Sequence, residues 1–225
     1  MSGPSAHLER ISEALGPSGI LVRGVVNFRP GEGPMLADGS RALSVVLLGN
    51  AGSSIWPAFS RWRETYQGAD PLDTWSKQLI HPLANDLGAA AYFPSDPPWQ
   101  PFQQWAMKAE GLKPSPLAIL IHPRYGLWHG YRGALGFSFE IEASAKAAGH
   151  PCDSCIKKPC LTACPAGVVN RSGFDVVTCR SYLGSEPGEK TCVVSGCLAR
   201  NACPVGTEFR YLPEQLKFHM QALMG

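Results

Sequence analysis

The chain has 225 residues, of which 44% are hydrophobic and 17% charged, the composition of a globular protein long enough to bury a core. Its formal net charge is only +2, from 20 basic and 18 acidic residues, and no block of lysines and arginines stands out. No apolar run approaches the roughly 20 residues of a membrane helix. We therefore expect neither nucleic acid nor a membrane as a partner.

The first ten residues are polar and include Glu9, without an apolar core region or a small-residue cleavage site. This pattern predicts no signal peptide and favours a cytoplasmic location. In a reducing cytoplasm, clustered cysteines are more often metal ligands than disulfides.

Strand and helix patterns alternate through the first 145 residues. In chain order, the sequence predicts a helix over 5–15, strands over 20–28 and 43–48, helices over 56–66 and 71–87, a strand over 89–93, a helix over 99–110, a buried strand over 117–121 and an extended stretch over 128–141. In the helix over 71–87, Asp70 should cap the start, Pro82 should introduce a kink and Gly88 should form the C-terminal cap. The alternation indicates a layered α/β or α+β domain.

Cysteine usage changes abruptly along the chain. Residues 1–151 contain no cysteine, whereas residues 152–203 contain all eight. The small-residue stretch over 143–151 has the composition of a linker, so we expect one domain over 1–145 and a second over 146–225. An amphipathic helix over 212–224 should pack back on the body.

The cysteines form two motifs, Cys152-x2-Cys155-x4-Cys160-x3-Cys164-Pro165 and Cys179 followed by Cys192-x4-Cys197-x5-Cys203-Pro204. The run of two-cluster bacterial ferredoxins is C-x2-C-x2-C-x3-C-P, in which the fourth cysteine ligates the other cluster. Applied here, this exchange predicts two complete ligand sets, Cys152, Cys155, Cys160 and Cys203 for the first [4Fe–4S] cluster and Cys164, Cys179, Cys192 and Cys197 for the second. Such clusters pass single electrons.

The spacings depart from the ferredoxin run by insertions that widen the loops near Cys160 and Cys192 without removing a ligand. Two zinc sites of four cysteines each would use the same eight thiolates, and so would four disulfides in an extracellular protein. The start of the chain argues against the disulfides. Colour separates the other two, because zinc protein is colourless and [4Fe–4S] protein is brown.

A second distinctive segment precedes the cysteines. The predicted strand over 117–121 ends in a proline-fixed turn that presents His122 and Arg124, followed by the aromatic residues Tyr125 and Trp128. Arginine is a forked donor for phosphate or amide oxygens, and the aromatic rings offer flat faces to a planar cofactor. The alternative is that His122 is a hydrogen-bonded turn histidine and Arg124 a surface charge.

The stretch His122-Pro-Arg-Tyr-Gly-x-Trp128, followed by Arg132-Gly133 and preceded by Gly88-Ala-Ala-Ala-Tyr92, resembles the CblC-type cobalamin-processing proteins. In that family such a stretch belongs to a cobalamin-binding domain whose fold is related to flavin nitroreductases. The resemblance implies a corrinoid partner contacted by His122, Arg124, Tyr125, Trp128, Arg132 and Gly133.

The cysteine region, with Cys160-Leu-Thr-Ala-Cys164-Pro and Cys179-Arg-Ser-Tyr182-Leu183, is similar to the two-cluster module of epoxyqueuosine reductase, and reductive dehalogenases share the same domain order. Together the resemblances imply an α+β protein, in which a nitroreductase-related (CblC-like) domain precedes a small domain like bacterial ferredoxin. They also imply an oxidoreductase that relays electrons from an external low-potential donor to cobalt, reducing cobalamin or removing its upper ligand.

The chain also departs from these families. Residues 204–225 contain no helical repeats like those with which epoxyqueuosine reductase binds tRNA, and no aspartate lies between residues 97 and 152 to match its catalytic one. No catalytic residue is therefore assigned. Reduction of a separate organic substrate, a plain electron carrier with a docking domain, and flavin in place of the corrinoid remain as alternatives.

Overall fold

The computed structural model describes residues 4–142, 149–170 and 173–224, and its chain divides into two compact units. Unit 1 comprises Met1–Gly111 and Gly130–Ala147, and unit 2 comprises Leu112–His129 and Ala148–Gly225. Unit 2 therefore includes a segment that the expected boundary at residue 145 assigned to the first domain. Of the predicted linker, residues 143–148 lie outside the described part of the chain.

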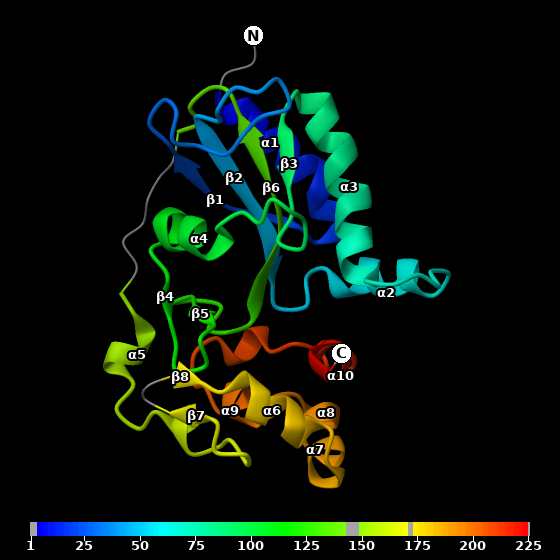
Figure 1. The fold of residues 1–225 in the computed structure, drawn as a ribbon, viewed down its shortest axis with the longest axis vertical. Helices are drawn as coiled ribbons and strands as arrows, with labels where there is room; N and C mark the ends of the chain where they lie inside the picture. The colour runs from blue at the N-terminus through cyan, green and yellow to red at the C-terminus, as the bar shows by residue number, and fades with distance from the viewer. Residues whose placement is uncertain (1–3, 143–148, 171–172, 225) are drawn as a thin grey trace. The chain divides into compact units, whose positions relative to one another are not determined.

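Unit 1 is built on a sheet with the strand order β1-β2-β6-β3 (Figure 1). The strands are β1 (Leu21–Asn27), β2 (Ser44–Ala51), β3 (Ala90–Tyr92) and β6 (His129–Phe137). β1 pairs with β2, and β3 with β6, in antiparallel register. Every residue of β2 is buried, so both faces of the sheet are covered.

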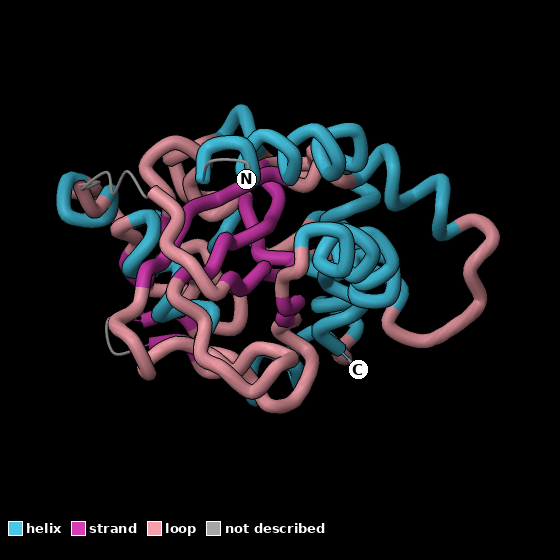
Figure 2. The backbone as a smooth tube through the Cα atoms, turned by 90° about the horizontal axis from the view of Figure 1, so that it is seen from above, coloured by secondary structure: helices cyan, strands magenta, loops and turns pink. Residues whose placement is uncertain are grey.

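The helices of unit 1 are α1 (Pro4–Leu15), α2 (Trp56–Arg63), α3 (Pro71–Leu87) and α4 (Phe102–Glu110). Figures 1 and 2 show α1 and α3 on one face of the sheet and α4 on the other. Glycines on the strands permit this close approach. A Cβ atom on Gly24 of β1 would lie 3.0 Å from Cβ of Ala109 in α4, and one on Gly133 of β6 would lie 2.8 Å from Cδ1 of Ile80 in α3.

Helix α3 has the predicted bounds and the predicted glycine cap, but Asp70 does not cap its start as expected. Asp70 occupies the N-cap position, but its side chain makes no capping hydrogen bond, and its backbone is left-handed at φ 46° and ψ 53°. An N-cap residue normally has an extended backbone, which aims its side chain at the first amides. Pro71 begins the helix, Pro82 lies inside it, and Gly88 at φ 63° ends it.

The strand predicted over 117–121 is mostly wrong. Only β5 (Leu120–Ile121) is extended, and it pairs with β4 (Lys113–Pro114) across a turn that Ser115 closes by donating to Ile119 O at 2.8 Å. Leu117 and Ile121 are nonetheless buried, at 4% and 2% exposure. The apolar run therefore reflects burial in the core of unit 2, which a short sequence cannot distinguish from a buried strand.

Unit 2 consists of short elements connected by tight turns. Besides β4 and β5, they are α5 (Pro151–Ser154), a 3-10 turn (Pro159–Leu161), β7 (Val169–Asn170), β8 (Gly173–Phe174), α6 (Val176–Leu183), α7 (Glu186–Lys190), α8 (Cys192–Ser195), α9 (Leu198–Asn201), a 3-10 turn (Thr207–Phe209) and α10 (Pro213–Met224). The C-terminal helix α10 is as predicted, and it buries Leu216 and Met220 in unit 2. The chain as a whole is a mixed α+β protein.

Candidate metal centres

The eight cysteines, all free thiols in the structure, border two separate cavities. A small cavity of about 20 Å³ is lined by Cys152, Cys155, Cys160 and Cys203. A second cavity, also of about 20 Å³, is lined by Cys164, Cys179, Cys192 and Cys197. Each cavity thus contains the four cysteines that the ferredoxin exchange assigns to one cluster. We call them the first and the second cysteine cavity.

Tight local turns bring the first set together. Cys152 lies in α5 and Cys155 directly follows this helix, while Cys160 lies in the next 3-10 turn. Lys158, with a left-handed backbone at φ 39°, reverses the chain between them, and its Nζ donates to Cys152 O at 3.0 Å. Cys203 joins them after α9 and is buried in the same apolar core.

Short helices carry the second set. Cys179 lies in α6, Cys192 begins α8, and Cys197 stands at the N-cap position of α9. The apolar cluster of Leu183, Cys192 and Met220 packs beside them. Helix α10 therefore supports the second cavity from residues beyond the last cysteine.

Burial and mutual repulsion both act on the thiols. Burial, and then the neighbouring thiols of Cys197, Cys164 and Cys192, raise the pKa of Cys179 to about 11. Burial also raises the pKa of Cys152, assisted by Cys203 and Cys160. Without a bound cation these thiols keep their protons at neutral pH, so a metal group must displace protons when it binds.

The donor sets fit a [4Fe–4S] group. Four thiols surround each cavity, and four cysteine thiolates are the ordinary ligands of such a cluster. A single zinc ion would instead draw four sulfurs into a tetrahedron with Zn–S distances of about 2.3 Å. Among the described residues, no group of three or more His, Cys, Asp or Glu that could hold a metal ion is found.

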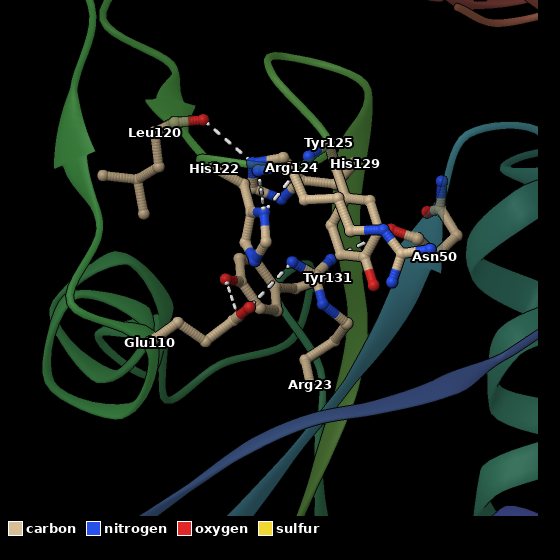
Figure 3. Close-up of polar contacts among 9 residues, drawn as sticks. All are labelled: Arg23, Asn50, Glu110, Leu120, His122, Arg124, Tyr125, His129 and Tyr131. Carbon is tan, nitrogen blue, oxygen red and sulfur yellow. Dashed lines mark hydrogen bonds and ion pairs between the residues drawn. The ribbon is translucent and has the colours of Figure 1, made fainter. Parts of the chain in front are cut away.

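The turn over residues 122–126, part of the stretch that resembles cobalamin-processing proteins, lies in unit 2. His122 and Gly126 bond to each other through both backbone amides, at 2.8 and 2.9 Å. The imidazole Nδ1 of His122 accepts from the amides of Arg124 and Tyr125 at 3.0 and 3.1 Å, and its ring stacks on Tyr125 at 4.3 Å (Figure 3). His122 therefore acts here as a hydrogen-bonded turn histidine.

Trp128 is fully buried, at 0% exposure. The Arg200 guanidinium lies 4.5 Å from the centre of its ring and 4.7 Å from that of Tyr211. Arg200 also donates to Leu127 O. Trp128 thus packs beside α9, the helix between Cys197 and Cys203, and its expected contact with a corrinoid stays a prediction.

The glycine of the same turn also packs on a cysteine loop. Gly126 has φ 57°, and a Cβ atom there would lie 1.9 Å from Val205 O, two residues after Cys203. Arg124 is exposed, with its guanidinium 5.5 Å from the ring centres of Tyr125 and Phe209. Arg124, one of the residues expected to contact a corrinoid, is thus exposed at the surface of unit 2.

The remaining expected contacts belong to unit 1. Arg132 and Gly133 lie on β6, where Arg132 is half-buried and Gly133 packs against Ile80. The close approach of α3 explains this glycine without a cofactor. The six residues that the resemblance implies are therefore divided between the two units.

A buried polar network in unit 1 was not predicted. Arg23 and Glu110 form an ion pair at 2.9 Å with side chains 3% and 8% exposed, and Tyr131 donates to the other oxygen of Glu110 (Figure 3). Burial, and then the charge of Glu110, raise the pKa of Tyr131. These residues come from β1, α4 and β6, so no local spacing in the sequence could reveal them.

Unit 1 also contains a cavity of about 500 Å³ along β3. His81, Asn85, Asp96 and Gln100 supply its polar side chains, and Ala89, Ala90 and Ala91 form part of its wall. None of the residues expected to contact a corrinoid lines it.

Comparison with models of protein families found no match, and a search of curated proteins found none. Among the helices that the structure describes, none has both the length and the apolar character needed to cross a bilayer.

Proposed function

We propose that the chain is a two-cluster iron–sulfur protein that transfers single electrons. The observation that carries this proposal is that two cavities are each lined by four cysteines. When bound, [4Fe–4S] clusters supply one-electron redox chemistry whose potential depends on net charge, hydrogen bonds to sulfur and solvent exposure. Unit 2 would then have a ferredoxin-like role.

The surrounding residues suit such centres. Pro165 and Pro204 directly follow ligand cysteines, and as prolines they offer no amide proton and turn the chain away. Apolar residues, including Leu117, Ile121 and Leu127, line the first cavity. Lys158 also lines it and adds one positive charge, which favours a reduced and more negative centre.

For the acceptor we propose a corrinoid, to which electrons pass so that cobalt is reduced or its upper ligand removed. Support comes from the resemblance of residues 122–133 to cobalamin-processing proteins and from the α+β character of unit 1, which is compatible with a nitroreductase-related fold. Arg124, exposed on the turn, would contact the polar periphery of the ligand.

A plain electron carrier is the second candidate. The burial of Trp128, the hydrogen bonds within the turn at His122 and the packing of Gly133 on Ile80 each give these residues a structural task. In this case unit 1 would serve to dock redox partners, and no small molecule would bind tightly.

An anaerobic titration separates the two. Hydroxocobalamin and methylcobalamin are added separately to the brown protein, and absorbance is recorded before and after the iron–sulfur centres are reduced. A base-off spectrum on binding, followed by loss of the Co(III) bands that depends on reduced centres, is the expected result. Arg124→Ala should weaken binding, whereas Lys217→Ala, an exposed lysine on α10, should not. No spectral change at protein concentrations well above micromolar would leave the electron carrier.

A further inference from the structure

The loop between Cys155 and Cys160 places an apolar side chain at the surface beside the first cysteine cavity. Ile156 is 97% exposed, the highest value among the large apolar side chains that the structure describes. A single exposed apolar residue is ordinary by itself. Ile156, however, directly follows one cysteine of the cavity and lies four residues before another.

The same loop is basic. Lys157 is exposed, whereas Lys158 folds back to donate to Cys152 O and lines the cavity. No acidic residue lies between them and either flanking cysteine, and the nearest in sequence is Asp153 in α5. One lysine therefore faces outward from this loop (after α5 in Figure 1) and the other faces the candidate centre.

The second cavity has a different border. Val177 in α6 is 71% exposed and Val194, between Cys192 and Cys197, is 54% exposed. The charged side chains exposed on α7 and around α6 are mostly acidic: Asp175, Glu186 and Glu189, against Arg180 and Lys190. Exposed apolar side chains thus lie beside both cavities, and the charge around them differs in sign.

Resting on the proposed electron-transfer function, we propose that the loop of Ile156 and Lys157 is the docking site of an acidic one-electron carrier protein. One electron leaves the reduced carrier and enters the centre held by Cys152, Cys155, Cys160 and Cys203. The carrier is oxidised by one electron, the centre is reduced by one, and no proton moves. The opposite charges of Lys157 and the carrier speed their encounter. The apolar contact with Ile156, which directly follows Cys155, holds the carrier next to the centre.

Stopped-flow reduction of the holoprotein by reduced flavodoxin, an acidic one-electron flavoprotein, tests this assignment. At low ionic strength, Lys157→Glu should slow the second-order rate roughly tenfold, and the difference should shrink as salt screens the charge. Ile156→Ser should slow the reaction roughly threefold at every salt concentration, since an apolar contact is not screened.

Two matched controls are available in unit 2. Lys217→Glu makes the same charge reversal at an exposed lysine on α10, and Val177→Ser removes an exposed apolar side chain beside the second cavity. Both should react as the wild type does. Titanium(III) citrate should reduce all five proteins to the same extent, which shows that the centres are intact.

Several results would overturn the assignment. Equal slowing by Lys217→Glu would show a general charge effect, and slowing by Val177→Ser alone would place docking at the second cavity. Failure of flavodoxin to reduce a wild-type protein that titanium(III) citrate does reduce would refute the docking site and leave the electron-transfer function standing. Purified protein without iron and sulfide would refute both.

Discussion

Each cysteine borders a cavity with three others, so a single substitution should damage one centre and spare its neighbour. Cys203 provides the sharpest case, because it follows Cys197 in sequence but lines the cavity of Cys152. We expect Cys203→Ser to remove about half of the iron, and to remove the same electron paramagnetic resonance signal as Cys152→Ser. Reduced samples of both variants, with iron and sulfide assays, provide the measurement.

The matched variant in the other motif is Cys164→Ser. It should remove the signal that Cys179→Ser removes, because these two cysteines line the second cavity. If Cys203→Ser and Cys197→Ser instead removed one common signal, the exchange of the fourth ligand between the motifs would be refuted.

The buried pair of Arg23 and Glu110 predicts a large effect in unit 1. Glu110→Gln leaves the guanidinium of Arg23 buried without a counter-charge, which should lower the free energy of unfolding by about 3–5 kcal/mol. Tyr131→Phe removes one hydrogen bond to a charged group and should cost about 1.5–3 kcal/mol. Urea unfolding followed by tryptophan fluorescence measures both.

The control for this prediction is Lys77→Gln. Lys77 and Asp96 form an ion pair whose side chains are 32% and 39% exposed, so its loss should cost at most about 1 kcal/mol. Equal losses for Lys77→Gln and Glu110→Gln would show that burial of the Arg23–Glu110 pair is not what makes it important.

Among the secondary elements, the turn over residues 122–126 is expected to support the first centre. Gly126→Ala would force a Cβ atom against Val205 O and also strain a left-handed residue. The displaced loop includes Cys203, so we expect faster iron loss from the first centre, with the second unchanged. The control is Gly39→Ala in unit 1. Gly39 also has a positive φ, of 83°, but an added Cβ atom there would meet nothing within 4 Å, so this variant has the backbone strain without the clash. Loss of both centres in Gly126→Ala would point to general unfolding of unit 2.

Helix α6 carries Cys179 and begins at an effective cap. Asp175 accepts from the amides of Val177 and Thr178, both at 3.1 Å, and from the Thr178 hydroxyl. These hydrogen bonds lower the pKa of Asp175 from its ordinary value of 3.8, and the bond from the Thr178 hydroxyl has the largest effect. The stabilisation is therefore present above pH 3.8 and is lost as the pH falls through the lowered pKa.

Substitution of the cap tests this account at neutral pH. Asp175→Ala should speed amide hydrogen exchange in residues 176–183, because two amides lose their acceptor. Asp175→Asn keeps an acceptor and should stay close to the wild type. Unchanged exchange in Asp175→Ala would show that packing alone holds α6.

At the scale of the whole molecule, the two units should depend differently on metal. Six of the eight cysteines pack in or against the apolar core of residues 117, 121, 127, 168, 169 and 199 in unit 2, whereas the core of unit 1 contains none. Removal of iron with an anaerobic chelator should therefore speed hydrogen exchange in residues 149–224 and leave most of unit 1 protected.

The segment over residues 112–129 makes this prediction specific. It precedes every cysteine in sequence but belongs to unit 2, so it should lose protection together with the cysteine region. If it remained protected with the strands of unit 1, the division into these two units would be wrong.

Local signals in the sequence predicted much of this arrangement. Periodic apolar residues indicated α1, α3 and α10, and the cysteine spacing predicted the four residues that share each cavity. The apolar run over 117–121 was misread as a strand, because burial and strand pairing leave the same short pattern.

Contacts between distant segments could not be predicted in this way. Arg23 pairs with Glu110, which is 87 positions away in the sequence. The contact of Arg200 with Trp128 depends on how a helix packs against a turn, which the spacing of residues in the sequence does not predict. For the stretch over residues 122–128, the local pattern left open both a ligand contact and a hydrogen-bonded turn histidine at His122. The structure shows the hydrogen bonds of that turn and the burial of Trp128 within unit 2.

The most direct test of the central claim is metal and sulfide analysis of anaerobically purified protein, with electron paramagnetic resonance of the reduced sample. Two [4Fe–4S] centres predict about eight iron and eight sulfide ions per chain, a brown colour and two interacting one-electron signals. About two zinc ions per chain in a colourless protein without sulfide would contradict the account and make unit 2 a zinc-stabilised module.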